Sequence, residues 1–447
     1  MSSRQCERGA PHIPDAAGGP HRAPRRSATR AFSGRLGGAT AQALLLVSLA
    51  TTVAAQAPDS AHPATSVAPS ADSVRKEDVF DLARRIFHIP PDTTKHDESS
   101  IAERGNLSLL PSLSASPTVG FKVGATIKLT KRYGDSATTN VSDVSSQVFF
   151  TTLKQFGLTA YGSVFTKDNK WNIRGDWRYL NTSQPTYGLG SIVPSDSSTA
   201  MKFQYLRLAE ALYRNVGSEI LLGGGYNFSM YFGIDDQDAK DGRVTPFLAY
   251  NGGHTVTQTI SSGPTFALLH DSRDNPLNAA RGLYAHVEAG ASPTWLGSTS
   301  TWESFLSDLR YYFRPGGWDR GILALWQMNW LTFGNPPYME LPATAWDRAG
   351  RMARGYGEGR IRGASLVYGE AEYRVTLTRN GLWGVVGFAS LTSVSSTPRS
   401  PLNAPDPAFG AGLRIKLSKR TNTNITLDYA LGREGSSGFF FGSAEAF

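Results

Sequence analysis

The sequence of 447 residues contains a single cysteine, Cys6, which lies near the start of the chain. Disulfide bonds therefore play no part in the predicted stability, and no cysteine stands where a lipoprotein would carry one. Long apolar runs are also missing, because no stretch of 18 apolar residues follows residue 57. No membrane-spanning helix is therefore predicted beyond that point.

The common catalytic signatures are missing as well. The sequence has no Gly-x-Ser-x-Gly elbow, no His-Glu-x-x-His and no phosphate-cradling glycine loop. Two of its histidines, His254 and His270, stand alone among residues of other chemistry. We therefore predict that the protein is not an enzyme and uses neither a cofactor nor a metal.

Most of the positive charge lies at the start of the chain. Residues 1–57 hold seven arginines against two acidic residues, so they carry +5 of the formal net charge of +8. The rest of the chain is nearly neutral, and nucleic acid is not predicted as a partner. The arginines precede the apolar run ALLLVSLATTVAA and Ala55-Gln56-Ala57, a pattern typical of a cleaved signal peptide. A retained anchor is the alternative, but the run is shorter than the ~20 residues of a spanning helix.

From residue 106 onward, apolar and polar side chains alternate. In KWNIRGDWRYLN the large apolar residues share one face and the polar residues share the other. The segment TNITLDYA likewise places Asp428 with Asn424 and Thr426 on its wet face. A period of two predicts β-strands with one apolar and one wet face.

Sixteen such segments follow one another, from one near 106–115 to one near 438–447. A soluble sandwich would usually have shorter strands, so the pattern favours an all-β fold, a 16-stranded antiparallel transmembrane barrel over 106–447. Long connections such as 182–200 and 231–257 alternate with short turns, which predicts an N-terminus in the periplasm.

Residues 58–105 are predicted to form a periplasmic linker with a short amphipathic helix near 77–89, which ends before Pro90-Pro91. The helix could be a free tail, a helix on the membrane surface or a plug of the lumen. Two aromatic and two basic residues suit a membrane interface: Phe80, Phe87, Arg84 and Arg85.

The connection between the eleventh and twelfth segments contains RMARGYGEGRIRG, with four arginines and four glycines in thirteen residues. Here the chain resembles the BamA/TamA-type outer-membrane barrels of the bacterial surface antigen superfamily, whose sixth outer loop carries Arg-Gly-(Phe or Tyr) at its tip. Arg354, Gly355 and Tyr356 match that tripeptide. The resemblance implies a lumenal loop, in which glycines permit tight turns and the guanidinium meets carboxylates of the inner wall.

The resemblance also suggests partners for Arg354. In the next segment, YGEAEYRV, Glu372 matches the partner glutamate of the family best, and Glu370 lies one pleat away. The following segment departs from the family's Phe-x-Asp-x-Gly, because Phe388 is followed by Ser390, which we predict as a further inner-wall partner. One carboxylate is therefore expected to be missing from the site, and our hypothesis is that Glu370 replaces it.

A second match is DSRDNPLNAARG at the turn between the eighth and ninth segments. Asp271, Arg273, Asp274 and Gly282 resemble the family's Asp-x-Arg-Asp turn with its later glycine. The expected role of this periplasmic turn is structural.

A third match is SGFFFGSAEAF at the end of the sequence. Phe439, Phe441 and Phe447 resemble a β-signal that the barrel-assembly machinery reads, so this machinery is an expected partner for insertion of the chain itself.

Residues 58–105 are too few for one POTRA domain, so the chain resembles a short, POTRA-lacking branch of the family. The resemblance implies an outer-membrane barrel that assists the insertion or translocation of proteins, or of lipids. Its expected partners are outer-membrane lipids and lipopolysaccharide, and unfolded outer-membrane protein clients. The alternative is a passive channel or a structural barrel without insertase activity, since client-capturing domains are not seen.

Overall fold

The fold is taken from a computed structural model, which describes residues 75–89, 105–116, 119–190, 192–194, 197–217, 219–348 and 350–447. The expected signal peptide, and the expected linker on either side of its helix, lie outside the described residues. Among the described residues, no helix has both the length and the apolar character needed to cross a membrane.

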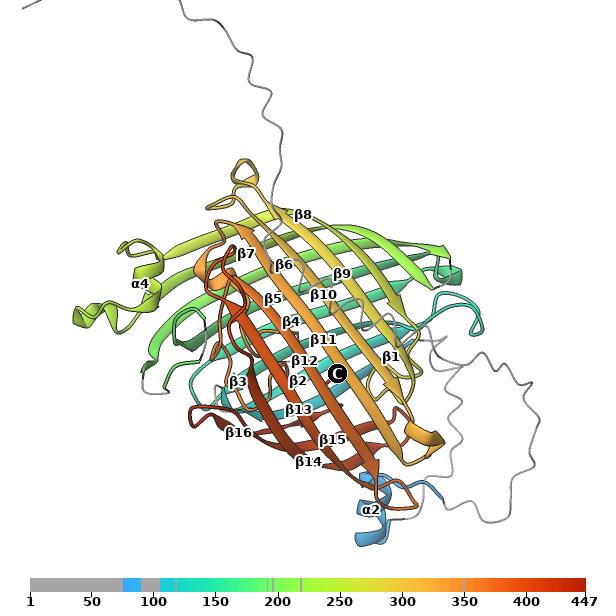
Figure 1. The fold of residues 1–447 in the computed structure, drawn as a ribbon. Helices are drawn as coiled ribbons and strands as arrows, with labels where there is room; N and C mark the ends of the chain where they lie inside the picture. Colours follow the sequence, from blue (N-terminus) through green and yellow to red (C-terminus); the bar gives the residue numbers. More distant parts are fainter. Residues whose placement is uncertain are drawn as a thin grey trace, which may run out of the picture. The chain divides into compact units, whose positions relative to one another are not determined.

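Sixteen strands dominate the described chain (Figure 1). They are β1 Asn106–Ser116, β2 Gly120–Lys131, β3 Ser142–Thr151, β4 Phe156–Phe165, β5 Trp171–Thr186, β6 Thr199–Gly217, β7 Ile220–Asp236, β8 Gln258–Asp271, β9 Gly282–Ser292, β10 Trp302–Phe313, β11 Gly321–Gly334, β12 Ser365–Thr376, β13 Trp383–Ser395, β14 Asp406–Ser418, β15 Thr423–Leu431 and β16 Ser437–Ser443.

The helices are few and short. They are α2 Val79–Ile86, α4 Pro246–Tyr250 and the 3-10 turns η1 Lys167–Asn169, η3 Ala239–Asp241, η4 Thr294–Leu296, η5 Pro315–Gly317 and η6 Tyr338–Glu340.

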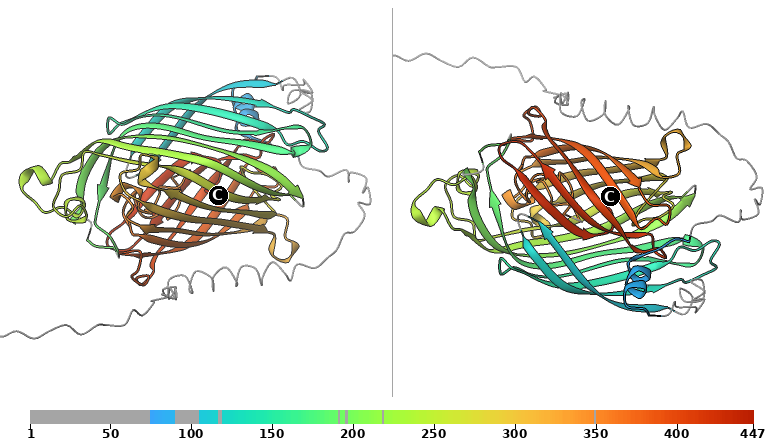
Figure 2. Two further views of the ribbon diagram at one scale, coloured as in Figure 1. Left: turned by 90° about the horizontal axis from the view of Figure 1, so that it is seen from above. Right: turned by 90° about the horizontal axis from the view of Figure 1, so that it is seen from below.

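Each strand pairs antiparallel with its neighbour in sequence, and β1 meets β16, so the sheet forms a closed barrel. The predicted 16-stranded antiparallel barrel is therefore confirmed. Closure gives every strand two neighbours, so no strand is left as an open edge of the sheet, although β1 and β16 pair at one registered position. Figure 2 shows the ring of strands from two further directions.

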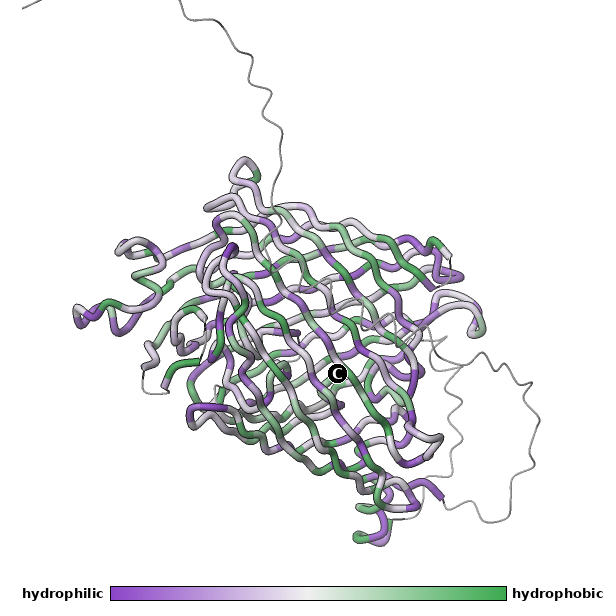
Figure 3. Tube along the Cα trace, in the orientation of Figure 1, coloured by the Kyte–Doolittle hydropathy of each residue, from purple (hydrophilic) through white to green (hydrophobic). Residues whose placement is uncertain are grey.

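The side-chain alternation explains why the barrel faces lipid on its outside. In β2, Phe121, Val123 and Ile127 are each more than half exposed, whereas Lys122 and Lys128 occupy the alternate positions. The same alternation of apolar and polar residues runs along many strands in Figure 3. Because apolar side chains are exposed on the outer face, this face is suited to hydrocarbon and not to water.

The two ends of the barrel differ. Connections after even-numbered strands are mostly short, as at 166–170 and 419–422, and we call this the short-turn end. The other end carries the long loops, including residues 335–364. The sequence pattern predicts strands near 201–213 and 217–230. In the structure β6 extends to Gly217 at the short-turn end and β7 extends to Asp236 at the long-loop end, because their pairing continues to Gly217–Ile220 and to Met201–Asp236.

Candidate functional site

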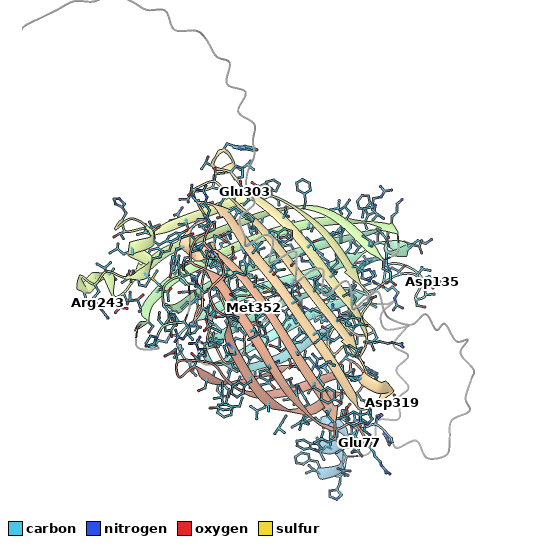
Figure 4. All side chains as sticks on the ribbon, viewed as in Figure 1. Glu77, Asp135, Arg243, Glu303, Asp319 and Met352 are labelled. Atoms are coloured by element: carbon cyan, nitrogen blue, oxygen red, sulfur yellow. The ribbon has the colours of Figure 1, made fainter. Side chains whose placement is uncertain are left out.

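The connection between β11 and β12, residues 335–364, folds into the barrel and is called the lumenal loop. Met352, Ala353 and Tyr356 have no exposed surface, and the Met352 label in Figure 4 lies inside the outline of the barrel. The loop closes on itself through a bridge between Ala343 and Arg362. A loop with so many charges is buried here because the inner wall supplies matching groups, from β12 to β15 around Arg354 and from β5 and β7 around Arg362 and Glu340.

Arg354, at the tip of this loop, binds three carboxylates. Its Nη1 donates to Asp428 Oδ2 at 2.6 Å, and its Nη2 donates to both Glu370 and Glu372. All four side chains are fully buried. The guanidinium also stacks on Phe388, 3.6 Å from the ring centroid, an arrangement favourable for a planar cation.

The charge network extends beyond the loop through two wall arginines. Arg414 Nε donates to Glu445 at 2.7 Å and also pairs with Asp428. Arg374 Nε donates to Glu372 at 2.6 Å. Each carboxylate partner of Arg354 thus has a further donor, since Tyr368 donates to Glu370. Shared donors reduce the repulsion expected among three neighbouring carboxylates.

Gly355 and Tyr356 fix the loop tip against β14 and β15. Gly355 has φ +104°, and an added Cβ would lie 3.0 Å from Leu431 O and 3.1 Å from Ala408 Cβ, so glycine is required by both conformation and space. Tyr356 Oη donates to Pro407 O at 2.6 Å and accepts from the Arg433 amide at 3.1 Å. Each of the three residues of the tripeptide therefore contacts the barrel wall.

Of the predicted inner-wall partners, Glu370 and Glu372 contact Arg354, but Ser390 does not. Its buried hydroxyl has no hydrogen-bond partner among the described residues. The third carboxylate comes instead from Asp428 of β15, which sequence reasoning placed on a wet face without linking it to Arg354. The expectation that the site lacks one carboxylate overlooked this strand.

The last residues turn into the lumen. Ala444 has a left-handed φ of +66°, which ends the extended path of β16, and the C-terminal marker lies within the barrel outline in all three views of Figures 1 and 2. Phe447 is 5% exposed, with its ring 5.0 Å from that of Trp326 and 6.1 Å from that of Tyr312. Arg374 donates to its carbonyl oxygen at 2.9 Å.

The other two aromatic residues of the proposed β-signal, Phe439 and Phe441, differ from Phe447. Phe439 is 62% exposed and stacks on Tyr429 of the outer wall at 4.7 Å, and Phe441 is paired to Ala115. The proposed β-signal is therefore divided between the outer wall and the lumen, and its reading by assembly machinery stays a prediction.

The turn between β8 and β9 is braced by its own side chains. Arg273 Nη2 donates to Asp271 Oδ2 at 2.8 Å, and Asp274 accepts from the amide of Ala280 at 2.9 Å. Gly282 has φ +108°, and a Cβ would lie 2.3 Å from Ser272 O. These contacts are internal to the turn and fit a structural role.

The same turn also reaches the β14–β15 turn. Asn278 Nδ2 donates to Asn422 O at 3.1 Å, and Asn422 Nδ2 returns a bond to Asn278 O at 3.3 Å. The amide of Glu445 donates to Leu277 O at 3.3 Å. Two turns separated by six strands are thereby connected across the short-turn end. Sequence reasoning did not anticipate this contact, because asparagine in a turn is usually explained by local conformation.

The junction of β1 and β16 is the least paired in the barrel. Among the described residues, only Ala115 and Phe441 are registered as partners there. On the far sides of these strands, β1 pairs with β2 from Asn106 to Ser116, and β16 pairs with β15 from Ser437 to Ser443. We call this junction the seam, and most of the backbone groups of β1 that face it have no strand partner.

Comparisons with solved structures agree with the fold. The chain is similar to BamA from Haemophilus ducreyi lacking POTRA domains 1–3, with a TM-score of 0.50 and 10% identity, over 77% of this chain and 70% of that one. It is also similar to CdiB from Acinetobacter baumannii, with a TM-score of 0.49 and 9% identity, over 76% of this chain and 65% of that one. At 10% identity, the similarity to BamA shows the barrel fold and nothing finer.

A more distant similarity is to OccK11 of Pseudomonas aeruginosa, with a TM-score of 0.33 and 12% identity, over 76% of this chain and 94% of that one. No protein-family model matches the sequence, and no curated protein matches it either.

Proposed function

We propose that this barrel assists the insertion or translocation of polypeptides at the bacterial outer membrane, with its short-turn end in the periplasm. The seam is the observation that carries the proposal. A strand whose N–H and C=O groups lack partners can pair with a strand of a client, as in β-augmentation. The resemblance of Arg354, Gly355 and Tyr356 to the loop tip of BamA/TamA-type barrels supports the same function. Unfolded outer-membrane proteins are the proposed clients, and lipids are a second class to test.

The lumenal loop has a clear place in this function. The contacts of its tip, Arg354 to Tyr356, lie on β12 to β15, and other residues of the loop bond to β5 and β7. In the described chain these contacts brace the wall without joining β1 to β16. A client can then exchange with the few bonds at the seam while the rest of the barrel stays intact. The arginine and its three carboxylates are thus positioning residues and not a catalytic site.

A reversible disulfide cross-link between β1 and β16 tests this proposal. Ala115 and Phe441 are replaced together by cysteine, and Cys6 is replaced by serine. The protein in liposomes is mixed with an unfolded β-barrel client, and the rate of client insertion is measured before and after oxidation. We expect acceleration by the reduced protein, loss of it on oxidation and recovery with reductant.

A cysteine pair at Leu113 and Val123 provides the matched control, because these residues are registered partners on the fully paired β1–β2 junction. Oxidation of this pair should leave the insertion rate unchanged. If the unlocked protein conducts ions but never accelerates insertion, the passive channel is the better description. Acceleration of lipid transfer alone would assign the seam to lipids.

A further inference from the structure

Helix α2 is fixed to the short-turn end of the barrel by its first turn and by the two residues that precede it, Glu77 and Asp78. The amide of Glu77 donates to Asn380 O at 3.0 Å, and Asn380 Nδ2 returns a bond to Glu77 Oε2 at 2.8 Å. The amide of Lys419 donates to Asp78 Oδ2 at 3.2 Å, and its ammonium pairs with Asp81. The helix is therefore bound to two separate turns, those after β12 and after β14.

These contacts exclude two of the three roles that the sequence left open. A helix with four bonds to the rim is not a free tail. It is not a plug either, because none of its residues from Val79 to Ile86 is buried and its partners lie on turns at the barrel end. Figure 1 accordingly shows α2 beside the end of β14 and β15.

The polar and apolar sides of α2 have opposite surroundings. Asp78 and Asp81 form a capping box and face the barrel turns. Four large apolar side chains on this segment are exposed in the described chain: Phe80 at 56%, Ile86 at 59%, Phe87 at 71% and Ile89 at 55%. The bonds to the rim thus fix the helix with its apolar side chains uncovered.

The neighbouring wall indicates what covers these side chains. Leu377 and Trp383 flank the turn that holds Glu77, and they are 53% and 40% exposed on the outer, apolar face of the barrel. A tryptophan at the end of a barrel strand is typical of the membrane–water interface. Helix α2 is therefore attached to a turn whose flanking residues already belong to the apolar, lipid-facing wall.

The basic residues of α2 suit the same surroundings. Arg84 and Arg85 occupy its last turn, and Arg85 Nη1 lies 3.5 Å from Glu77 at the rim. With about 100° per residue, Arg84 is about 40° around the helix from Phe80. A cation beside an aromatic stripe is the arrangement of helices that lie in the headgroup region.

We propose that α2 lies on the surface of the phospholipid bilayer at the short-turn end, with Phe80, Ile86 and Phe87 in the boundary between headgroups and acyl chains. This contact goes beyond the proposed function and does not depend on it. It fixes the barrel's depth and orientation beside the turns after β12 and β14.

The test places an environment-sensitive fluorophore on cysteine in the full chain with C6S. Phe87→Cys reports on α2, and Asp319→Cys reports on water at the same end, because Asp319 is 95% exposed on the turn after β10. Figure 4 shows Glu77 and Asp319 at that end. The protein is reconstituted in vesicles of phosphatidylcholine and phosphatidylglycerol, with or without a spin-labelled quencher on the acyl chain.

We expect the label at position 87 to emit at shorter wavelength and to lose most of its intensity to the lipid-borne quencher. The label at position 319 should be quenched by aqueous iodide instead. Phe80→Ser combined with Ile86→Ser should shift the label at 87 toward the behaviour at 319, while the heat-modifiable mobility of the barrel stays unchanged.

Two results would overturn the proposal. In the first, the label at 87 responds to iodide as strongly as the label at 319 and not to the lipid-borne quencher. In the second, it is shielded from both quenchers, which would assign the apolar face to a second copy of the chain or to another protein.

Discussion

The wall of β11 to β15 and the wall of β1 to β4 belong to one barrel but have different interiors. In the first wall, Arg354 and Asp428 form an ion pair with no exposed surface. In the second, Lys128 and Asp143 are 3.8 Å apart, with 35% and 40% of their side chains exposed. The same chemistry is thus dry on one side and wet on the other. The tip of the lumenal loop fixes β12 to β15 on one side of the seam, whereas the ion pair on the β1 side is open to solvent.

Because of this difference, the contacts that stabilise the barrel are separate from the contacts that must break for the seam to open. The buried network lies on β12 to β15 and not on β1, so parting β1 from β16 does not require breaking it. Because the Lys128–Asp143 pair is exposed, a polypeptide that enters next to the seam meets solvent on the β1 to β4 wall. The following predictions test whether substitutions in the two walls differ in their effect on the free energy of unfolding.

The largest effect is expected for Arg354→Ala. The substitution leaves Glu370, Glu372 and Asp428 buried without their shared cation, which typically destabilises by about 3–5 kcal/mol. The measurement is the unfolding midpoint in detergent, followed by heat-modifiable mobility. Lys128→Ala is the control, and an exposed pair of this kind contributes only about 0.2–1 kcal/mol. Equal losses for both variants would contradict the difference between the walls.

The next effect is expected for Phe447→Ala. Removal of this ring leaves a cavity beside Trp326 and Tyr312, and a loss near 3 kcal/mol is the lower end for a buried phenylalanine. Phe439→Ala is the control, because Phe439 is 62% exposed on the outer wall. If urea unfolding in micelles gives the two variants the same midpoint, then Phe447 does not support the fixed wall.

A smaller effect is expected for Gly355→Ala. The positive φ and the close approach to Leu431 predict a loss of about 1–3 kcal/mol and increased protease cleavage within residues 350–364. Gly369→Ala is a matched control in β12, where nothing lies within 4 Å of an added Cβ. Unchanged protection of the loop in Gly355→Ala would show that its tip tolerates a side chain.

The smallest effect concerns the attachment of α2 to the fixed wall. Burial acts to raise the pKa of Asp81, but its hydrogen bond with Lys419 and nearby positive charge leave the pKa below its ordinary value of 3.8. A lowered pKa means that this contact stabilises the docked helix above pH 3.8 and is lost as the pH falls through the folded value.

Hydrogen exchange of the α2 amides, corrected for intrinsic rates, measures this attachment. We expect protection to be constant near neutral pH and to fall in acid, while protection of β12 changes less. Asp81→Asn should remove the pH dependence attributed to this carboxyl. A wild-type profile that matches the variant at every pH would exclude Asp81 as the group responsible.

The barrel itself could be predicted because its signal is repetitive. The alternation seen in KWNIRGDWRYLN recurs in sixteen segments. An error in the bounds of one strand, as for β6 and β7, therefore does not change the predicted number of strands. The lumenal placement of Arg354 and its contacts with two glutamates could be predicted from the Arg-Gly-Tyr motif, because this motif stands in the connection between the eleventh and twelfth strands. Local pattern and motif therefore account for the strands and for part of the site.

The contacts that were missed join strands distant in sequence. Asp428 has the same wet-face pattern as many other polar residues, so nothing in TNITLDYA distinguishes it as a partner of Arg354. The bonds between Asn278 and Asn422 depend on two turns meeting across the end of the barrel. Such pairs are determined by the curvature and register of the closed sheet, which a single strand does not encode.

The three carboxylates around Arg354 also impose an order on assembly. Two belong to β12 and one belongs to β15, so a dry site for the guanidinium exists only after the last quarter of the chain has joined the sheet. Until then the loop tip keeps its water, because dehydrating an arginine without its partners is too costly. Burial of the loop tip is therefore a late step in barrel assembly. In a precursor trapped before this step, the lumenal loop should lie outside the barrel.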